Sequence, residues 1–523
     1  MLYTGAHLNQ ISFPLGGIGT GSIGLAGNGS LVDWEIFNRP AKGSLNPYTC
    51  FAIKAEFPCG KTVAKILQGD FTGNLTGQYS PSGVSSFGHG PDSLGMHGYP
   101  HFRKVRFDGQ FPVATLTFED EDFPAKVVLK AFNPFIPLDA FHSSIPAAFF
   151  EIRIQSQDDN IRYTVLLNMG NPFPSGINEV IENEHYTAVK LSHFGKQKTD
   201  LDYGDLTVAV DATDGICQEY WYRGNWSQDK VTTFWHEFST APLKNRHYNT
   251  PAFRDVCSVG AVRTLSHGEK AKLRFVITWN VPNNYNYWRP SKDETGRDIS
   301  WKNYYATVFA DSTASCSYSL QNWDLLYKQT DRFRKVLHNS TLDKAVIDAV
   351  SSTLSVLKSP TVLRLEDGTF YGWEGLHERT GSCEGTCTHV WSYAYALCFL
   401  FPELERSLRE TEFRFDTDPD GRCISVPPCR LIAMFGEIRH RVSTDRWQLS
   451  SKYTGTGSLP VIHNGCAKTG TTLKKCWNLH GQKPTRTNGT GTKTVFWKAG
   501  SIILWMWSYL APPPGCKVCI WPR

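Results

Sequence analysis

The amino-acid sequence predicts a multidomain protein of the β + α class, in which a large β-sandwich precedes an all-α domain. Of its 523 residues, 41% are hydrophobic and 13% aromatic, which supplies enough apolar surface for two buried cores. Hydrophobic residues alternate with a period of two up to about residue 310, and beyond it they recur three and four residues apart. This change of period predicts a domain boundary between residues 290 and 320.

Short strand-like runs dominate residues 1–310. They are rich in β-branched and aromatic residues, and clusters of Gly, Pro, Asn and Asp separate them, as in a β-sandwich. The predicted strands are Val113–Phe118, Lys126–Phe132, Ala148–Ile154, Tyr163–Leu167, Leu206–Val210, Thr232–Phe238 and Lys272–Trp279.

Helical spacing follows the predicted boundary. Two amphipathic helices and one almost wholly apolar, buried helix are predicted over Ser319–Leu337, Leu342–Leu357 and Thr388–Phe401. Pro402 suits the first turn of a further amphipathic helix, which ends before the turn sequence Asp418–Gly421. We therefore predict an all-α domain over residues 311–421.

Charge is distributed unevenly along the chain. Residues 423–523 carry 14 Lys or Arg and two acidic residues, a net charge of +12, whereas residues 1–422 carry a net charge of −7. A basic tail that binds nucleic acid is therefore one alternative function. Because the basic residues follow no helical stripe, we expect no nucleic-acid partner.

The sequence shows no membrane or secretion signal. No apolar run reaches the roughly 18 residues that a spanning helix needs. The first residues also lack the basic start and apolar stretch of a signal peptide. We therefore expect a cytoplasmic protein with no transmembrane segment, whose 14 cysteines are reduced thiols.

Two short motifs favour structural roles over binding roles. Gly19–Gly24 fits the pattern GxGxxG, but no strand has room before it and no helix-like stretch follows, so a glycine-rich turn is the better interpretation. Cys383, Cys387 and His389 have a metal-like spacing, but they lack an obvious fourth ligand. We therefore expect no metal site and no cofactor.

One carboxylate has the surroundings of a catalytic group. Glu374 follows the aromatic sequence Phe370–Trp373 and precedes Gly375, just before the apolar run. Such a carboxylate is partly desolvated, and glycosidase carboxylates use desolvation and ring contacts. A glutamate in an exposed turn is the competing interpretation.

Longer motifs resemble those of a known enzyme family. Phe13–Gly21 (FPLGGIGTG) and Asp33–Pro40 (DWEIFNRP) resemble the opening of glycoside hydrolase family 116, which contains the non-lysosomal glucosylceramidase and bacterial β-glucosidases. Further matches are Glu366–Gly375, Cys387–Trp391 and Phe401–Arg406. The resemblance covers residues 10 to about 421.

This resemblance implies a β-sandwich followed by an (α/α)6 barrel, and hydrolysis of a β-glucoside with retention. A retaining enzyme holds its nucleophile and its acid/base carboxyl group ~5 Å apart. The family's nucleophile motif falls on Glu374, and Glu378 and Glu384 are the alternatives. His389 and Thr388 fall where the family binds glucose, so the resemblance assigns them to substrate binding.

The resemblance ends at Gly421. The family's acid/base Asp is expected far downstream in a Thr-aromatic-Asp or Thr-Leu-Asp motif, which this chain lacks. Read from the third base of each codon, Phe496–Lys498 must encode Leu-Glu and Trp505–Trp507 must encode Asp-Val. The codons between them permit a family-like acid/base segment. The hypothesis is a single frame change near Asp420–Cys423; a divergent or lineage-specific tail is the alternative.

The sequence thus predicts a sandwich at residues 1–310, an incomplete barrel at residues 311–421 and a poorly ordered out-of-frame tail at residues 422–523. Because the acid/base Asp is missing, we expect little or no turnover of the β-glucoside substrate. A non-catalytic carbohydrate-binding protein built on the sandwich is the remaining alternative function.

Overall fold

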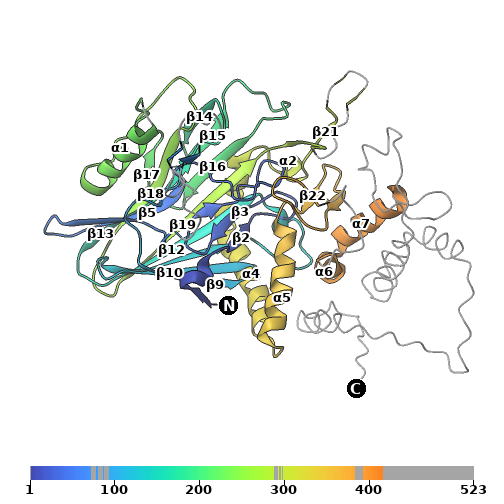
Figure 1. Ribbon diagram of the computed structural model, residues 1–523, viewed down its shortest axis with the longest axis horizontal. Coiled ribbons are helices and arrows are strands. Elements are labelled where there is room, and N and C mark those ends of the chain that lie inside the picture. The colour runs from blue at the N-terminus through green and yellow to red at the C-terminus, as the bar shows by residue number, and fades with distance from the viewer. Residues whose placement is uncertain are drawn as a thin grey trace, which may run out of the picture.

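The structure is a computed structural model, and it describes residues 2–71, 78–79, 86–87, 94–225, 227–287, 292–293, 296, 298–382 and 393–415. Most strands of the described chain lie before residue 303, and most helices follow (Figure 1). The predicted tail at residues 422–523 lies outside the described residues.

Two antiparallel sheets form the body of the protein. The larger sheet has nine strands in the order β1 (Leu2–Thr4), β9 (Lys104–Gln110), β10 (Val113–Glu119), β11 (Ala125–Phe132), β12 (Ala147–Ser156), β19 (Lys270–Asn280), β16 (Asp205–Val210), β15 (Thr187–His193) and β14 (Gly176–Ile181). The smaller has five, in the order β17 (Ile216–Gln218), β18 (Val256–Leu265), β13 (Ile161–Gly170), β5 (Cys50–Glu56) and β6 (Thr62–Ile66).

The two sheets pack face to face through a shared apolar core. The ring of Phe51 on β5 packs against two adjacent strands of the larger sheet. Its centroid lies 5.2 Å from that of Phe150 on β12 and 5.3 Å from that of Phe275 on β19. Side chains that alternate along each strand fill the space between the sheets, as in a β-sandwich. The predicted sandwich is therefore confirmed.

Short strands and helices complete the described chain. The strands are β2 (Ser12–Leu15), β3 (Ile23–Ala26), β4 (Leu31–Val32), β7 (Gln78–Tyr79), β8 (Ser86–Phe87), β20 (Asn283–Tyr285), β21 (Ser300–Lys302), β22 (Val362–Arg364) and β23 (Phe370–Gly372). The α-helices are α1 (Ser227–Thr240), α2 (Tyr305–Val308), α3 (Ser312–Gln321), α4 (Trp323–His338), α5 (Lys344–Ser355), α6 (Ala394–Leu400) and α7 (Pro402–Phe415). Short 3-10 turns are η1 (Gly5–Leu8), η2 (His142–Ser144) and η3 (Val356–Lys358).

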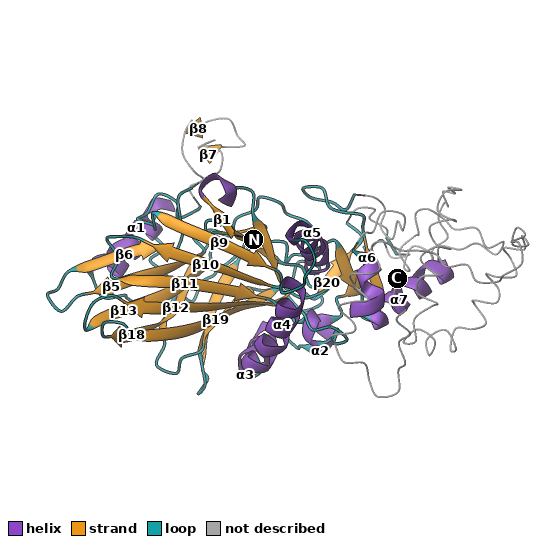
Figure 2. Ribbon diagram, turned by 90° about the horizontal axis from the view of Figure 1, so that it is seen from below, coloured by secondary structure: helices purple, strands orange, loops and turns teal. Residues whose placement is uncertain are grey.

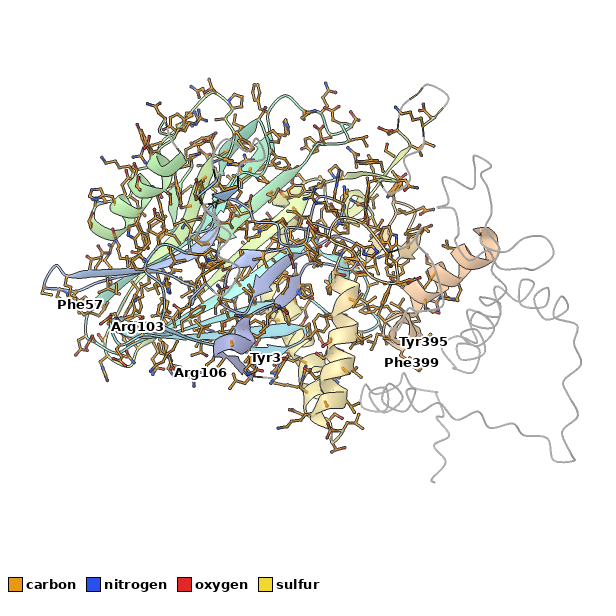
Figure 3. The ribbon with its side chains drawn as sticks, viewed as in Figure 1. Tyr3, Phe57, Arg103, Arg106, Tyr395 and Phe399 are labelled. Atoms are coloured by element: carbon orange, nitrogen blue, oxygen red, sulfur yellow. The ribbon has the colours of Figure 1, made fainter. Side chains whose placement is uncertain are left out.

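Helices cover the outer face of the larger sheet at one end of the sandwich (Figure 2). On β12, Phe150 faces the smaller sheet, whereas its neighbour Phe149 packs against Trp323 of α4 at 5.2 Å between ring centroids. Because both faces of the strand are covered at this end, its first four residues, Ala147–Phe150, are all apolar, whereas Glu151–Gln155 alternate between polar and apolar. Helices α6 and α7 lie beyond this end, and Tyr395 and Phe399 of α6 lie far from Phe57 (Figure 3).

Six of the seven predicted strand runs lie in strands, and the seventh prediction is wrong. Thr232–Phe238 belongs to helix α1. Its β-branched and aromatic residues favour a strand, but Val231, Phe234 and Phe238 are buried at helical spacing. The Phe234 ring stacks on that of Trp221, which follows β17 of the smaller sheet, with 3.8 Å between the ring centroids. This apolar stripe outweighs the local propensity.

The predicted helices are present with altered bounds. The single helix predicted over Ser319–Leu337 is wrong, because Asn322 separates α3 from α4 and donates its side-chain amide to the Tyr318 carbonyl at 2.9 Å. The Leu342–Leu357 prediction is confirmed by α5 and η3. Of the run ending at Phe401, α6 is the described helical part, and Pro402 opens α7 as predicted.

The larger-scale predictions are not all tested. The domain limits at residues 310 and 421 and the incomplete (α/α)6 barrel stay predictions. None of the helices in the described part of the chain combines the length and the apolar character that crossing a membrane requires.

Asp311 joins the sandwich to the first long helix of the second half. Its carboxylate accepts a hydrogen bond from Ala314 N at the start of α3 (2.9 Å) and contacts Lys190 Nζ of β15 at 3.0 Å. Burial would raise the pKa of Asp311, but the backbone N–H and the Lys190 ammonium outweigh it and hold the pKa below its ordinary value of 3.8. The ionised carboxylate therefore stabilises this junction.

We expect Asp311→Asn to lower the free energy of unfolding at pH 7 by up to about 1 kcal/mol, because Asn still caps the helix but cannot pair with Lys190. A depressed folded pKa gives stability that is present above the unfolded pKa and is lost as pH falls through the folded one. The wild type should therefore lose more stability than the variant below about pH 4. Denaturant unfolding between pH 3 and 7 measures this, with exposed Asp158→Asn as control. Equal acid sensitivity of wild type and Asp311→Asn would contradict the assignment.

Candidate active site

The short hairpin of β22 and β23 lies between the sandwich and helices α6 and α7 (Figure 1), and Glu374 follows this hairpin in the chain. Strands β22 and β23 pair antiparallel, and the chain then passes through Trp373 to Glu374. Trp373 is fully buried, whereas Glu374 is half-buried. An aromatic residue in the core therefore stands directly before a carboxylate that reaches the surface.

The backbone before Glu374 is held from two sides. Trp373 N donates to the Thr361 carbonyl at 2.9 Å, and the Tyr393 hydroxyl donates to the Trp373 carbonyl at 2.5 Å. The Trp373 indole also meets the Tyr371 ring edge-on, with centroids 5.4 Å apart. These contacts join the hairpin to residues on either side of it in sequence, so little freedom remains at the position of Glu374.

The loop after Glu374 folds back on itself. Ser382 N donates to the Gly375 carbonyl at 3.1 Å, and His377 N donates to the Thr380 carbonyl at 2.8 Å. Gly381 lies flat against the Trp373 indole, and a Cβ at this position would overlap the ring. We call residues 375–382 the nucleophile loop, because it follows the predicted nucleophile.

The sandwich contacts the nucleophile loop at two points. Lys42 N donates to the Glu378 carbonyl at 3.0 Å, and the Tyr287 hydroxyl lies close to the backbone of Gly381. Burial is the main reason that the pKa of Tyr287 is raised above its ordinary value. The Arg39 guanidinium lies 5.9 Å from the centroids of both the Tyr285 and Tyr287 rings. Both contact points thus come from segments that follow short strands, β4 and β20, which lie outside the two large sheets.

Two buried acids hold the segment that carries Lys42. Glu35 is 1% exposed; it accepts from Ala41 N at 3.1 Å and from Lys42 Nζ at 2.8 Å. Asp33 accepts from Gly43 N and from Ser12 Oγ, both at 2.6 Å. Burial raises the pKa of Glu35, although hydrogen bonds from Lys42 and Ala41 partly oppose the rise.

The glycine-rich turn also reaches the hairpin. Gly19 has a φ of +75°, and a Cβ there would lie 2.9 Å from Arg364 N of β22. Only glycine combines this left-handed backbone with so close an approach. The turn interpretation of Gly19–Gly24 is therefore confirmed, and the turn serves to bring the sandwich against β22.

The predicted site residues divide into described and undescribed ones. Glu374 and Glu378 lie in the described chain, and Glu378 is exposed on the nucleophile loop beside Arg379. Glu384, Thr388 and His389 lie outside the described residues, as do Cys383 and Cys387. Within the described ranges, no group of three His, Cys, Asp or Glu side chains is arranged to hold a metal ion.

The sequence analysis missed the polar group under the nucleophile loop. Asp33, Glu35 and Lys42 belong to or follow the family motif DWEIFNRP, which served only as a marker of resemblance. The available signal was two acids, two residues apart, among apolar neighbours, which predicts buried carboxylates with partners. Positive φ values at Asp33 (+48°) and Asn38 (+63°) show that this segment has a specific, strained backbone.

Comparison with known proteins identifies the family. The model described as "beta-glucosidase 2, glycosyl-hydrolase family 116 N-term" matches residues 12–326, which is more than half of the chain. The chain therefore belongs to glycosyl-hydrolase family 116, as its motifs predicted. No curated protein matches it.

Similar solved structures include a putative kojibiose phosphorylase from the human microbiome (9% identity, 81% of this chain, 50% of that chain, TM-score 0.35). A family GH92 α-mannosidase (8% identity, 61% and 38%, TM-score 0.27) and a GH92 inverting mannosidase (10% identity, 77% and 44%, TM-score 0.31), both of Bacteroides thetaiotaomicron, are also similar. The chain spans half or less of the length of these proteins.

The two glycines of the nucleophile loop provide a matched test of its packing. Gly381→Ala should destabilise the protein by about 1–3 kcal/mol, because its Cβ must displace the Trp373 indole. Gly375→Ala should change stability by less than about 0.5 kcal/mol, because nothing lies within 4 Å of its added Cβ. Denaturant unfolding and limited proteolysis of the loop measure both. Equal effects of the two variants would show that Gly381 does not pack on Trp373.

Proposed function

We propose that this family 116 chain is related to retaining β-glucosidases and that Glu374 is the nucleophile. The supporting observation is the half-buried Glu374 placed directly after the fully buried Trp373. The pinned backbone on its N-terminal side limits movement of the carboxylate, and a positioned nucleophile lowers the entropic barrier to attack. Burial of its neighbours keeps the carboxylate partly desolvated.

The proposed reaction has two steps. Glu374 attacks the anomeric carbon of a β-glucoside, the bond from that carbon to the aglycone oxygen breaks, and the leaving oxygen takes a proton from an acid. Water then attacks the glucosyl ester, loses a proton to a base and releases glucose and the Glu374 carboxylate. No residue of the chain is assigned to the acid/base role, so we propose that activity on ordinary glucosides is impaired.

The domain organisation is part of the same proposal. Residues 1–310 form the sandwich, residues 311–421 begin an (α/α)6 barrel and residues 422–523 are read out of frame. Thr388 and His389, outside the described residues, contact the glucose unit. The family relationship supports a carbohydrate substrate, and the β-glucosidase type of the matching model supports glucose as the sugar.

Covalent labelling tests the nucleophile without requiring an acid. A 2,4-dinitrophenyl 2-deoxy-2-fluoro-β-glucoside has a leaving group that departs unprotonated, and its fluorine slows hydrolysis of the ester that forms. We expect mass spectrometry to find one fluoroglucosyl group on the peptide that contains Glu374. Glu378→Gln should be labelled like the wild type, whereas Glu374→Gln should not be labelled.

Other labelling results would contradict the proposal. Labelling of Glu378 or Glu384 would move the nucleophile to an alternative residue. Absence of any label, together with sugar binding that is equal in wild type and Glu374→Gln, would instead favour a non-catalytic carbohydrate-binding protein.

Because the acid/base residue is missing, we expect a change of reading frame that restores it to increase β-glucoside hydrolysis. Adding one base, or removing two, near codon 421 should open a frame that encodes the family-like Leu-Glu and Asp-Val segments. The resulting protein should hydrolyse an aryl β-glucoside at least about a hundredfold faster than the present chain, the usual contribution of one acid/base group. Sequencing of the coding DNA and a hydrolysis assay of both proteins measure this. Equal rates, both abolished by Glu374→Ala, would show that the present chain supplies its own acid.

A further inference from the structure

We propose that Asp33, Glu35 and Lys42 act together as a clamp through which the sandwich positions the nucleophile loop, with Glu35 as the principal positioning residue. This inference rests on the proposed role of Glu374. Lys42 contacts the loop through its backbone N–H, and the two acids act on the loop through the turn at Lys42, so their role differs from that of a catalytic residue.

The first step is the shape of the turn at Lys42. Glu35 binds the backbone N–H of Ala41, and Asp33 binds the backbone N–H of Gly43. The two carboxylates thus hold the residues on either side of Lys42. The Lys42 ammonium returns to Glu35 at 2.8 Å and lies 3.8 Å from Asp33. The turn is therefore closed by charge as well as by backbone hydrogen bonds.

The second step is the direction of the remaining donor. Because the backbone N–H groups of Ala41 and Gly43 are bonded to the two carboxylates, the turn has a fixed shape. In this shape the backbone N–H of Lys42 donates to the Glu378 carbonyl, 3.0 Å away. Glu378 lies in the nucleophile loop, and Gly381 of the same loop lies close to the Tyr287 hydroxyl, just after β20. Since Trp373 is fixed by Thr361 and Tyr393, the chain is anchored on both sides of Glu374.

The third step is the attachment of the clamp to the sandwich. Asp33 accepts a hydrogen bond from Ser12 Oγ of β2, and the Trp34 side chain between the two acids is buried. Asn38 extends this attachment, because its amide donates to the Asn283 carbonyl at 2.7 Å beside the Tyr285–Tyr287 segment. Both loop contacts therefore come from one connected part of the sandwich.

The burial of Glu35 supports a positioning role. A carboxylate that is 1% exposed is costly to bury, and an apolar side chain would fill the same volume without that cost. What an apolar side chain cannot supply is two directional acceptors, one for Ala41 N and one for Lys42 Nζ. Glu35 therefore provides orientation at the expense of stability.

Hydrogen exchange and labelling kinetics test the clamp on the full chain. Glu35→Gln keeps the acceptor for Ala41 but turns an amide N–H₂ toward Lys42, so the turn should open. We expect exchange in residues 375–382 to become roughly tenfold faster, while strands β10 to β12 keep their protection. The labelling rate constant at Glu374 should fall roughly tenfold, with less than a twofold change in the reagent's apparent dissociation constant.

Two further variants separate the clamp from general damage. Lys42→Met should act like Glu35→Gln, and the double variant should be no worse than either single one, because both remove the same pair. Glu56→Gln is the matched control: Glu56 also pairs with a lysine and an arginine of the sandwich, but on β5 and β13. It should leave loop exchange and labelling unchanged.

The outcomes distinguish the two proposals. If the wild type is labelled at Glu374 and Glu35→Gln is labelled equally fast, the clamp is overturned and the nucleophile stands. If the wild type is not labelled, the proposed function fails, and loop exchange alone decides the clamp. Unchanged exchange in residues 375–382, or faster exchange throughout the sandwich, would overturn it.

Discussion

Burial of one end of the nine-stranded sheet on both faces is the constraint on which the rest of the structure depends. Its inner face meets the five-stranded sheet through Phe150, and its outer face meets α4 through Phe149. The chain must therefore leave the sandwich at the end where α3 and α4 cover the sheet. Phe135 continues this packing, with ring centroids 5.0 Å from Phe333 of α4 and 5.2 Å from Phe401. The hairpin that carries Glu374 is consequently delivered beside the N-terminal turns.

Buried polar groups then favour one way of packing the helices against the sandwich. Lys358 is fully buried, and its ammonium donates to the carbonyls of Pro134 (2.6 Å) and Ser143 (2.7 Å). The Ser143 carbonyl also accepts from Ile18 N at 2.8 Å, in the glycine-rich turn. Burial lowers the pKa of Lys358 well below its ordinary value, because removing a cation from water is costly. Such groups tolerate few alternative packings, because each lost hydrogen bond leaves a buried polar atom unpaired.

The parts of this structure that sequence predicts are those governed by local periodicity. Strand β10 follows from alternation, β16 follows from its β-branched and apolar residues, and α5 follows from helical spacing. Thr232–Phe238 was mispredicted because local propensity and tertiary packing conflict there. The setting of Glu374 was predictable from its aromatic neighbours. The importance of Glu35 was not, because it depends on Lys42 and on a loop that is distant in sequence.

The family motifs and the contacts of the site are related physically. The glycine-rich turn and the DWEIFNRP segment belong to the sandwich, whereas the motif ending in Glu374 belongs to the hairpin. In the structure Gly19 packs on Arg364 of that hairpin, and the Asp33–Lys42 segment holds the nucleophile loop. A glycine with a left-handed backbone and two buried acids are each costly for folding alone. Their presence in the same contact region is explained if the sandwich helps to hold the Glu374 carboxylate in position. If Glu374 is the nucleophile, as proposed, the sandwich then takes part in catalysis by positioning it, and the later residues without the sandwich would lose this restraint on Glu374.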